Sequence, residues 1–161
     1  MENIIYFAPT GGRDLSQAAH LLLERALGYA PDLSFGAHGK PYLAGREDLY
    51  FSLSHTQGAA VCALSARPCG VDLEGPRRIN TALAARYFTA AEAAFARTPQ
   101  RFLIVWTRKE ALLKRDGLGI TVPLKQMEAL LTKEVVTRMV QGYTLSFCGD
   151  PTGFSLKIVR L

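Results

Sequence analysis

The chain has 161 residues, of which 48% are hydrophobic and 20% charged, a balance that excludes an intrinsically disordered protein and suits one substantial core or two small halves. Its formal net charge of +5 fits an anionic partner, such as a nucleotide, an acidic protein or a nucleic acid. No signal-peptide pattern and no apolar run of about 20 residues is present, so we expect a cytoplasmic protein with no membrane partner. The three cysteines have no metal-ligand spacing and are expected to be small buried hydrophobes.

The N-terminal part of the sequence predicts a strand followed by a helix. The apolar residues 4–8 form the strand, which a Pro-Thr-Gly-Gly turn ends. Asp14 can cap the helix, and Gly28 is a stop signal. Arg13 precedes this helix, where it opposes the helix dipole unless an anion lies nearby. An Arg13 side chain that is simply solvated, with no anion beside it, fits the sequence equally well.

Two short stretches that follow are candidate phosphate sites. Lys40 lies in a Gly-Lys-Pro segment, which can bring backbone donors and one cation to a phosphate, although an ordinary turn is the default. A strand over residues 49–53 leads to Ser54 and His55 and then to a second apolar run, which predicts a hairpin with this Ser-His pair at its tip. The pair is not a hydrolase site, because no nucleophile elbow surrounds it.

Ala-Arg67-Pro68 is the predicted join between a shortened N-terminal half, residues 1–66, and a C-terminal half, residues 67–161. The fold class predicted is α+β, with each half a small antiparallel sheet packed with helices. In the second half we expect a strand at 70–74, helices at 82–87, after Thr89 and at 99–115, and a final hairpin formed by residues 143–148 and 154–159.

One helix and one strand of the second half carry acidic residues that share a face. Phe102, Trp106, Glu110 and Lys114 form an i, i+4 row on the predicted helix. A surface Glu–Lys pair would explain part of this row and contributes only about 0.3–0.5 kcal/mol. Asp72 and Glu74, however, lie on one face of the strand, and three carboxylates with a lysine would suit a hard cation carrying a phosphorylated substrate.

These two motifs, Gly-Val-Asp72-Leu-Glu74 and Trp106-Thr-Arg-Lys-Glu110-Ala-Leu-Leu-Lys114, resemble the signatures of the 4'-phosphopantetheinyl transferases, with the surfactin-synthetase-activating (Sfp) type the nearest match. The resemblance covers roughly residue 13 to the C-terminus. It implies two pseudo-symmetric halves with coenzyme A bound in the cleft between them.

The resemblance also implies roles for individual residues. Asp72, Glu110 and often Glu74 would hold Mg²⁺, with Mn²⁺ the open alternative, and Lys114 would contact the pyrophosphate. Ser54, His55, Lys40 and Arg13 match nucleotide-binding positions of the family.

The implied reaction joins coenzyme A to an apo acyl- or peptidyl-carrier protein, an acidic partner used in fatty acid, polyketide or nonribosomal peptide biosynthesis. The serine hydroxyl of the carrier attacks the β-phosphate, the phosphopantetheine arm is transferred and adenosine 3',5'-bisphosphate leaves. Positioning and charge neutralisation suffice for such a transfer. Glu110 could accept the serine proton directly or through a metal-bound water.

Two other functions compete with this interpretation. A degenerate member of the family would bind coenzyme A without transferring anything; the N-terminal half, which is short for the Sfp type, favours it, and the intact Asp72, Glu74, Glu110 and Lys114 argue against it. Because that half is short, we expect either a lower affinity for coenzyme A or a larger contribution of Arg13 and Lys40 to binding it. A nucleic-acid-binding domain fits the charge but lacks a basic stripe interleaved with aromatics. Both acidic motifs occur in one chain, so a monomer is expected.

Overall fold

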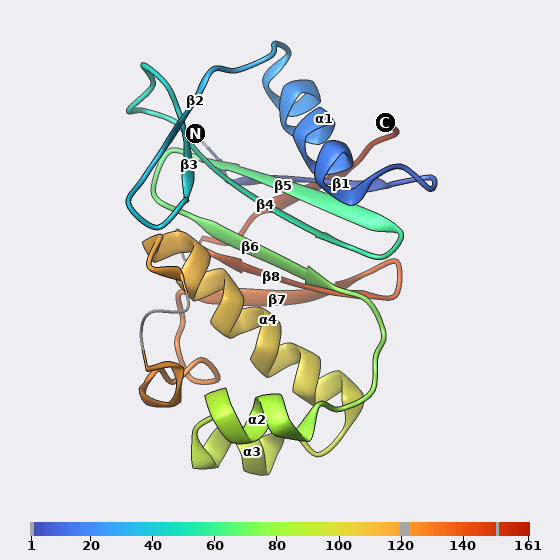
Figure 1. The fold of residues 1–161 in the computed structure, drawn as a ribbon, viewed down its shortest axis with the longest axis vertical. Coiled ribbons are helices and arrows are strands. Elements are labelled where there is room, and N and C mark those ends of the chain that lie inside the picture. The colour runs from blue at the N-terminus through green and yellow to red at the C-terminus, as the bar shows by residue number, and fades with distance from the viewer. Residues whose placement is uncertain (1, 120–122, 151) are drawn as a thin grey trace.

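The computed structural model describes residues 2–119, 123–150 and 152–161, and its fold is α+β, as the sequence predicts (Figure 1). Its elements, in chain order, are β1 (Ile4–Pro9), α1 (Leu15–Leu27), β2 (Leu33–Phe35), β3 (Pro41–Leu43), β4 (Tyr50–Thr56), β5 (Ala59–Ser65), β6 (Gly70–Glu74), α2 (Thr81–Tyr87), α3 (Ala90–Phe95), α4 (Pro99–Asp116), the 3-10 turn η2 (Leu124–Gln126), β7 (Val135–Val140), β8 (Tyr143–Cys148) and β9 (Ser155–Ile158).

Two larger sheets pack face to face, and a helix covers the outer face of each (Figure 1). The first sheet has the order β4-β5-β1-β9 and the second the order β6-β8-β7. Because side chains alternate along β5, one set faces the second sheet and the other faces α1, and the whole strand is buried. Helix α4 lies on the opposite face of the second sheet, against β6 and β8. The four layers are therefore α1, first sheet, second sheet and α4.

Where β4 of the first sheet lies beside β6 of the second, serine side chains accept the hydrogen bonds that a neighbouring backbone strand would otherwise accept. Strand β6 pairs with β8 on one side only, so the N–H groups of Val71 and Leu73 need partners on the other side. Two serines of β4 supply them: Ser52 Oγ accepts from the Val71 N–H at 3.0 Å, and Ser54 Oγ accepts from the Leu73 N–H at 3.2 Å. The edge of the first sheet is thus fixed directly against the strand that carries the acidic motif.

Gly70 lets α4 lie directly on β6. A Cβ atom at this position would stand 1.9 Å from the Ala111 carbonyl oxygen and 2.5 Å from the Arg115 nitrogen, both backbone atoms of α4. No side chain fits there without moving the helix. Since Asp72 and Glu74 share this face of β6, the close contact brings them against the next turns of α4.

Local signals explain where the helices begin. The side chains of Asp14, Asn80, Thr89 and Thr98 accept hydrogen bonds from backbone N–H groups in the first turns of α1, α2, α3 and α4. Thr89 forms a complete capping box with Glu92. Helix α4 ends at Asp116 and is capped by Gly117, whose φ of 66° is in the left-handed region that favours glycine.

The predicted C-terminal hairpin is wrong. Strand β8 pairs with β6 and with β7, a strand that the sequence pattern does not predict, and β9 instead runs parallel to β1 in the first sheet. The turn between β7 and β8 is Gln141-Gly142, with φ values of 48° and 84°, which match the type I′ geometry typical of two-residue hairpins. The Ser54-His55 pair was also placed at a hairpin tip, whereas β4 continues to Thr56.

The predicted division of the chain near Pro68 falls between β5 and β6, which belong to different sheets. Because β9 returns to the first sheet, residues near the C-terminus complete the sheet that β1 begins. A division into two halves at this point stays a prediction.

Two further expectations concern the chemistry of the chain as a whole. All three cysteines are free and buried, as predicted from their spacing. Burial raises the pKa of the Cys148 thiol to about 11, so it is protonated at neutral pH. Across the described ranges, no helix combines the length and apolar content needed to cross a membrane.

Candidate active site

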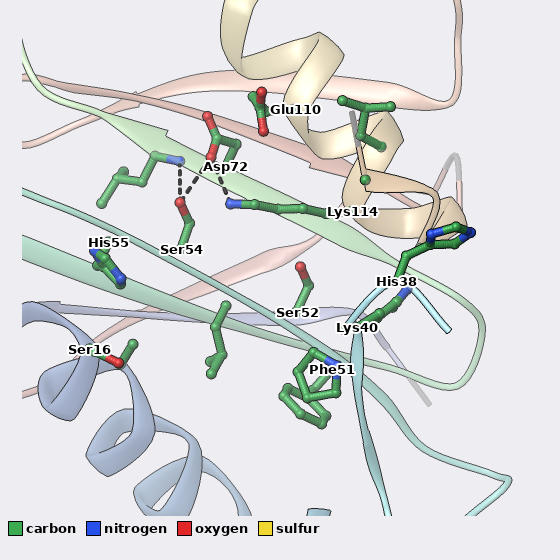
Figure 2. A pocket seen from close by; sticks show the side chains of 18 of the residues that line it. Ser16, His38, Lys40, Phe51, Ser52, Ser54, His55, Asp72, Glu110 and Lys114 are labelled. Atoms are coloured by element: carbon green, nitrogen blue, oxygen red, sulfur yellow. Dashed lines mark hydrogen bonds and ion pairs between the residues drawn. The ribbon is translucent and has the colours of Figure 1, made fainter. Parts of the chain in front are cut away.

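A cavity of about 500 Å³ lies between α1, β4, β6, α4 and the loop before β3 (Figure 2). This volume is within the range of about 300–1,000 Å³ that small-molecule sites occupy. The residues that line this cavity include seven that the sequence predicts as site residues: Lys40, Ser54, His55, Asp72, Glu74, Glu110 and Lys114. The structure thus gathers seven of the eight predicted site residues around one cavity, while Arg13 is not among the lining residues.

Asp72 is the most constrained side chain of the cavity. It is 6% exposed, and its Oδ1 accepts hydrogen bonds from Ser54 Oγ at 2.9 Å and from Lys114 Nζ at 2.8 Å (Figure 2). Its Oδ2 is the one buried side-chain oxygen or nitrogen of the described residues that has no hydrogen-bond partner. Because an unsatisfied buried acceptor costs about 1–3 kcal/mol, this oxygen is open to a water or a bound cation.

Glu110 faces the same cavity from the middle of α4. Burial, followed by the negative charge of Asp72, raises the pKa of the Glu110 carboxyl from 4.5 to about 7. The nearby ammonium group of Lys114 only partly opposes that shift. Near neutral pH this carboxyl is therefore poised between its acid and base forms.

Glu74 is held at the edge of the cavity by two donors. Its Oε1 accepts from Trp106 Nε1 at 3.1 Å and pairs with the guanidinium of Arg77 at 3.2 Å. Burial and then the charge of Asp72 raise the pKa of the Glu74 carboxyl, while Arg77 and Trp106 lower it. Its Oε1 therefore has two protein donors already, in contrast to Asp72 Oδ2.

The residues present fit a hard cation that is held mainly by its substrate. No three histidine, cysteine, aspartate or glutamate side chains within residues 2–119, 123–150 and 152–161 are arranged as a metal-binding group. Two carboxylates, Asp72 and Glu110, face one cavity, and one of their oxygens lacks a partner. Mg²⁺ is commonly held by one or two carboxylates together with substrate phosphates and waters, so this donor set suits it.

The two lysines of α4, Lys109 and Lys114, have different tasks: one lies in the protein interior and the other faces the cavity. Lys114 has a side chain 31% exposed, and one N–H of its ammonium group is used by Asp72, which leaves two N–H groups for a ligand. Lys109 instead is fully buried, pairs with Glu92 at 2.8 Å and donates to the carbonyls of Leu124 and Met127. The Lys109-Glu110 dipeptide therefore anchors the helix on one side and serves the cavity on the other.

The predicted nucleotide-binding residues lie in different settings. His55 is an exposed residue of the cavity wall, whereas Ser54 is buried and bonded to Asp72. Lys40 donates to the carbonyls of Arg115 at 2.6 Å and of Cys69 at 3.4 Å, so its ammonium group caps the end of α4. Burial lowers the pKa of Lys40. Arg13 donates to the Thr10 carbonyl at 3.4 Å.

The lining residues that were not predicted include Ser16, His20 and His38. All three histidines of the chain, His20, His38 and His55, therefore line this one cavity. Ser16 and His20 have the i, i+4 spacing that puts them on one face of α1, which is the signal the sequence offered. Figure 2 shows Ser16 and His55 on the α1 side, across the cavity from Glu110 and Lys114.

This chain is similar in sequence to known proteins of one family. The profile of the 4'-phosphopantetheinyl transferase superfamily matches residues 68–160. The 4'-phosphopantetheinyl transferase AcpT of Salmonella typhi is 33% identical over 95% of this chain and 85% of its own length. A 4'-phosphopantetheinyl transferase of Bacillus subtilis is 32% identical over 66% of this chain, and Sfp of Bacillus subtilis strain 168 is 27% identical over 60% of it.

The chain spans about half the length of the two Bacillus proteins, 52% and 46% respectively. The family match nevertheless covers more than half of the chain, including β6 and α4, which carry Asp72 and Glu110. We conclude that this chain belongs to the 4'-phosphopantetheinyl transferase superfamily.

Proposed function

We propose that this protein transfers the 4'-phosphopantetheine arm of coenzyme A to a serine of an acyl- or peptidyl-carrier protein and releases adenosine 3',5'-bisphosphate. One observation carries the proposal: Asp72 and Glu110 face the same cavity as Lys114, and Asp72 Oδ2 is buried without a partner. Membership of the superfamily supports the same reaction.

The charges around the cavity support a substrate with several phosphate groups. Lys114 supplies a cation beside the carboxylates, and three histidines line the cavity walls. Neutral or protonated imidazole N–H groups donate to phosphate oxygens, and the ammonium group of Lys114 has two N–H groups that Asp72 does not use. We assign the pyrophosphate to the Lys114 end and the adenosine phosphate to the histidine side.

Asp72 and Glu110 are the residues we propose to hold Mg²⁺, with Glu74 beside them. When bound, Mg²⁺ would neutralise the charge on the pyrophosphate oxygens. In the transfer, the serine oxygen of the carrier forms a bond to the β-phosphorus and the bond to adenosine 3',5'-bisphosphate breaks. The hydroxyl proton needs an acceptor, and Glu110 is the carboxylate that we propose to take it, directly or through a water.

An arginine-rich surface next to the cavity supports an acidic carrier as the partner. Residues 75–106 contain one carboxylate, Glu92, which is buried in its ion pair with Lys109. The same segment has five exposed arginines: Arg77, Arg78, Arg86, Arg97 and Arg101. Most of the net positive charge of the chain therefore lies on this segment, and a partner with acidic side chains would complement it.

This arginine-rich surface is continuous with the cavity. Arg77 contacts Glu74, and Glu74 accepts from Trp106, one turn before Glu110 on α4. The ring of Trp106 contacts that of Tyr87 on α2, with centroids 6.0 Å apart. A carrier bound over α2 and this part of α4 would have its serine close to Glu110.

The test is transfer to a carrier protein. Apo-carrier proteins are incubated with this protein, coenzyme A and Mg²⁺, and their intact masses are measured; we expect the mass of one phosphopantetheine to be added. Asp72→Asn, a nearly isosteric control, is expected to abolish the gain. A protein that binds coenzyme A saturably but modifies none of a broad carrier panel would favour the binding-only function.

A further inference from the structure

Glu74 lies at the border between the cavity and the arginine-rich surface. It lines the cavity, yet its side chain is still 19% exposed, and its Oε1 pairs with the guanidinium of Arg77 at 3.2 Å. The indole N–H of Trp106 donates to the same oxygen at 3.1 Å. An arginine of the outer surface therefore holds a carboxylate of the cavity wall.

Arg77 itself is accessible to a partner. Its side chain is 38% exposed, and it is one of the five exposed arginines of residues 75–106. Its guanidinium also lies 5.7 Å from the centre of the Phe102 ring, one turn before Trp106 on α4. An ion pair that is this exposed to water is weak, so a carboxylate of a bound protein can compete with Glu74 for Arg77.

Without a metal, Arg77 acts as a counter-cation for the acidic side of the cavity. Burial, followed by the charge of Asp72, raises the pKa of the carboxyl groups of Glu74 and Glu110. The charge of Arg77 opposes that rise at both carboxyl groups. A divalent cation that approaches the same carboxylates is repelled by the guanidinium, because both are positive. Arg77 and a metal therefore compete for Glu74.

We propose that Arg77 couples the arginine-rich surface to the metal site. It pairs with Glu74 in the free protein, and a carboxylate of the carrier draws it away, so that Glu74 becomes available to a divalent cation. Binding of the carrier and binding of the cation then strengthen each other. This inference rests on the proposed function in two respects: the partner is an acidic carrier, and the carboxylates of the cavity bind a cation.

The chain contains a matched control in the next residue. Arg78 is exposed like Arg77, and its side chain makes none of the hydrogen bonds or ion pairs found in the described part of the chain. Arg77→Gln and Arg78→Gln each remove one positive charge from the arginine-rich surface, and both are expected to weaken carrier binding. Only Arg77→Gln removes a cation from Glu74.

The first experiment measures binding of Mn²⁺, as a probe, to the full chain with coenzyme A present, by electron paramagnetic resonance. We expect Arg77→Gln to lower the Mn²⁺ dissociation constant about fivefold, at the lower end of the usual range for coupled sites. Arg78→Gln should have an Mn²⁺ affinity close to that of the wild type. The melting temperatures of both variants in EDTA should stay near that of the wild type, because exposed ion pairs contribute little to stability.

A second variant tests whether the effect passes through Glu74. Glu74→Gln removes the charge with which Arg77 pairs, so adding Arg77→Gln to it should bring a much smaller gain in Mn²⁺ affinity. The single tryptophan of the chain, Trp106, donates to the same oxygen of Glu74 and provides an independent signal. We expect Mg²⁺ to change the tryptophan fluorescence of the wild type and to change that of Glu74→Gln far less.

Coupling between two binding sites is reciprocal, so the metal should also strengthen carrier binding. The affinity for a labelled apo-carrier protein is measured in Mg²⁺ and in EDTA at equal ionic strength, with adenosine 3',5'-bisphosphate replacing coenzyme A so that no transfer occurs. We expect Mg²⁺ to tighten carrier binding about fivefold in the wild type and in Arg78→Gln. In Arg77→Gln, carrier binding should not depend on Mg²⁺.

Three results would overturn the proposal: Mn²⁺ affinity no higher in Arg77→Gln than in Arg78→Gln, an undiminished gain in the Glu74→Gln background, or wild-type carrier binding that Mg²⁺ does not change. If the wild type binds and modifies no carrier protein, yet Arg77→Gln still tightens Mn²⁺ binding through Glu74, the proposed function fails and the competition between Arg77 and the metal stands. Transfer by the wild type with unchanged Mn²⁺ affinity in Arg77→Gln would mean the reverse.

Discussion

The two sides of the cavity are built in different ways. On the α4 side, Asp72, Glu74 and Lys114 are bonded to other protein groups, and a fully buried ion pair anchors the helix behind them. On the α1 side, His20, His38 and His55 are exposed residues, and their side chains make none of the hydrogen bonds found in the described part of the chain. The first side is organised without a ligand, whereas on the second side we propose that the histidines find their partners on the ligand.

This difference predicts where substitutions will affect folding, rate or substrate affinity. Groups held in place can stabilise charge that develops during the reaction, and they also contribute to the stability of the protein. Groups that wait for a ligand contribute to binding and should be replaceable without loss of stability.

The largest effect is expected behind α4, at the buried pair of Lys109 and Glu92. Removing one partner of such a pair typically costs about 3–5 kcal/mol, because it leaves a buried charge without its partner. Lys109→Met should therefore lower the free energy of unfolding by this amount in urea titrations. Adding Glu92→Leu to this variant should cost less than the sum of the two single changes. If Lys109→Met is as stable as the wild type but inactive, Lys109 acts in catalysis.

The next effect concerns Lys114, which belongs to the organised side but has N–H groups free for a substrate. Lys114→Ala should slow transfer on the order of a hundredfold, since losing one donor to developing charge costs about 2.7–4 kcal/mol. Its melting temperature should change little, because the side chain is partly exposed. Lys114→Arg should restore only part of the rate, because a planar guanidinium does not replace a point charge. Wild-type rates in the alanine variant would remove Lys114 from the site.

On the α1 side, we expect His55→Ala to change substrate affinity alone. Loss of one hydrogen bond to a charged group corresponds to about 1.5 kcal/mol, or roughly a tenfold rise in the KM for coenzyme A. The kcat and the melting temperature should stay close to those of the wild type. A fall in kcat with unchanged KM would mean that the α1 side is also part of the catalytic apparatus.

The same difference explains what the sequence could predict. The Gly70–Glu74 strand, the α4 helix and the cap at Asp14 depend on neighbours a few residues away, and all are found as predicted. The pairing of β9 with β1 joins residues about 150 positions apart, and no local pattern specifies it. Likewise, the bond between Ser54 and Asp72 exists only because two sheets meet at β4 and β6.

The histidines show the same limit in the functional site. His55 was identified because it follows a strand and a serine, whereas His20 and His38 carry no local motif. They reach the cavity because α1 and the loop before β3 pack beside β4. Arg13 is the one predicted site residue outside the cavity lining; it donates to the Thr10 carbonyl, and its role toward a phosphate stays a prediction.

The last expected effect, and the most specific one for the organised side, is the pH dependence that Glu110 contributes in the absence of metal. Its pKa is raised from 4.5 to about 7, so between these values the folded protein binds more protons than the unfolded chain. Stability from this group therefore falls as the pH rises from about 4.5 to 7. Glu110→Gln carries no charge at any pH, so this fall in stability with rising pH should be absent from the variant.

In EDTA, the melting temperature of Glu110→Gln should exceed that of the wild type at pH 8, and the difference should shrink toward pH 5. Because a cation favours the ionised carboxylate, Mg²⁺ should bind the wild type more tightly at pH 8 than at pH 6. Mg²⁺ should also stabilise the wild type more than the glutamine variant at pH 8. A difference in melting temperature that does not vary with pH would mean that Glu110 titrates normally, and the cavity would then lack the burial and the charge of Asp72 that make it a site for a cation.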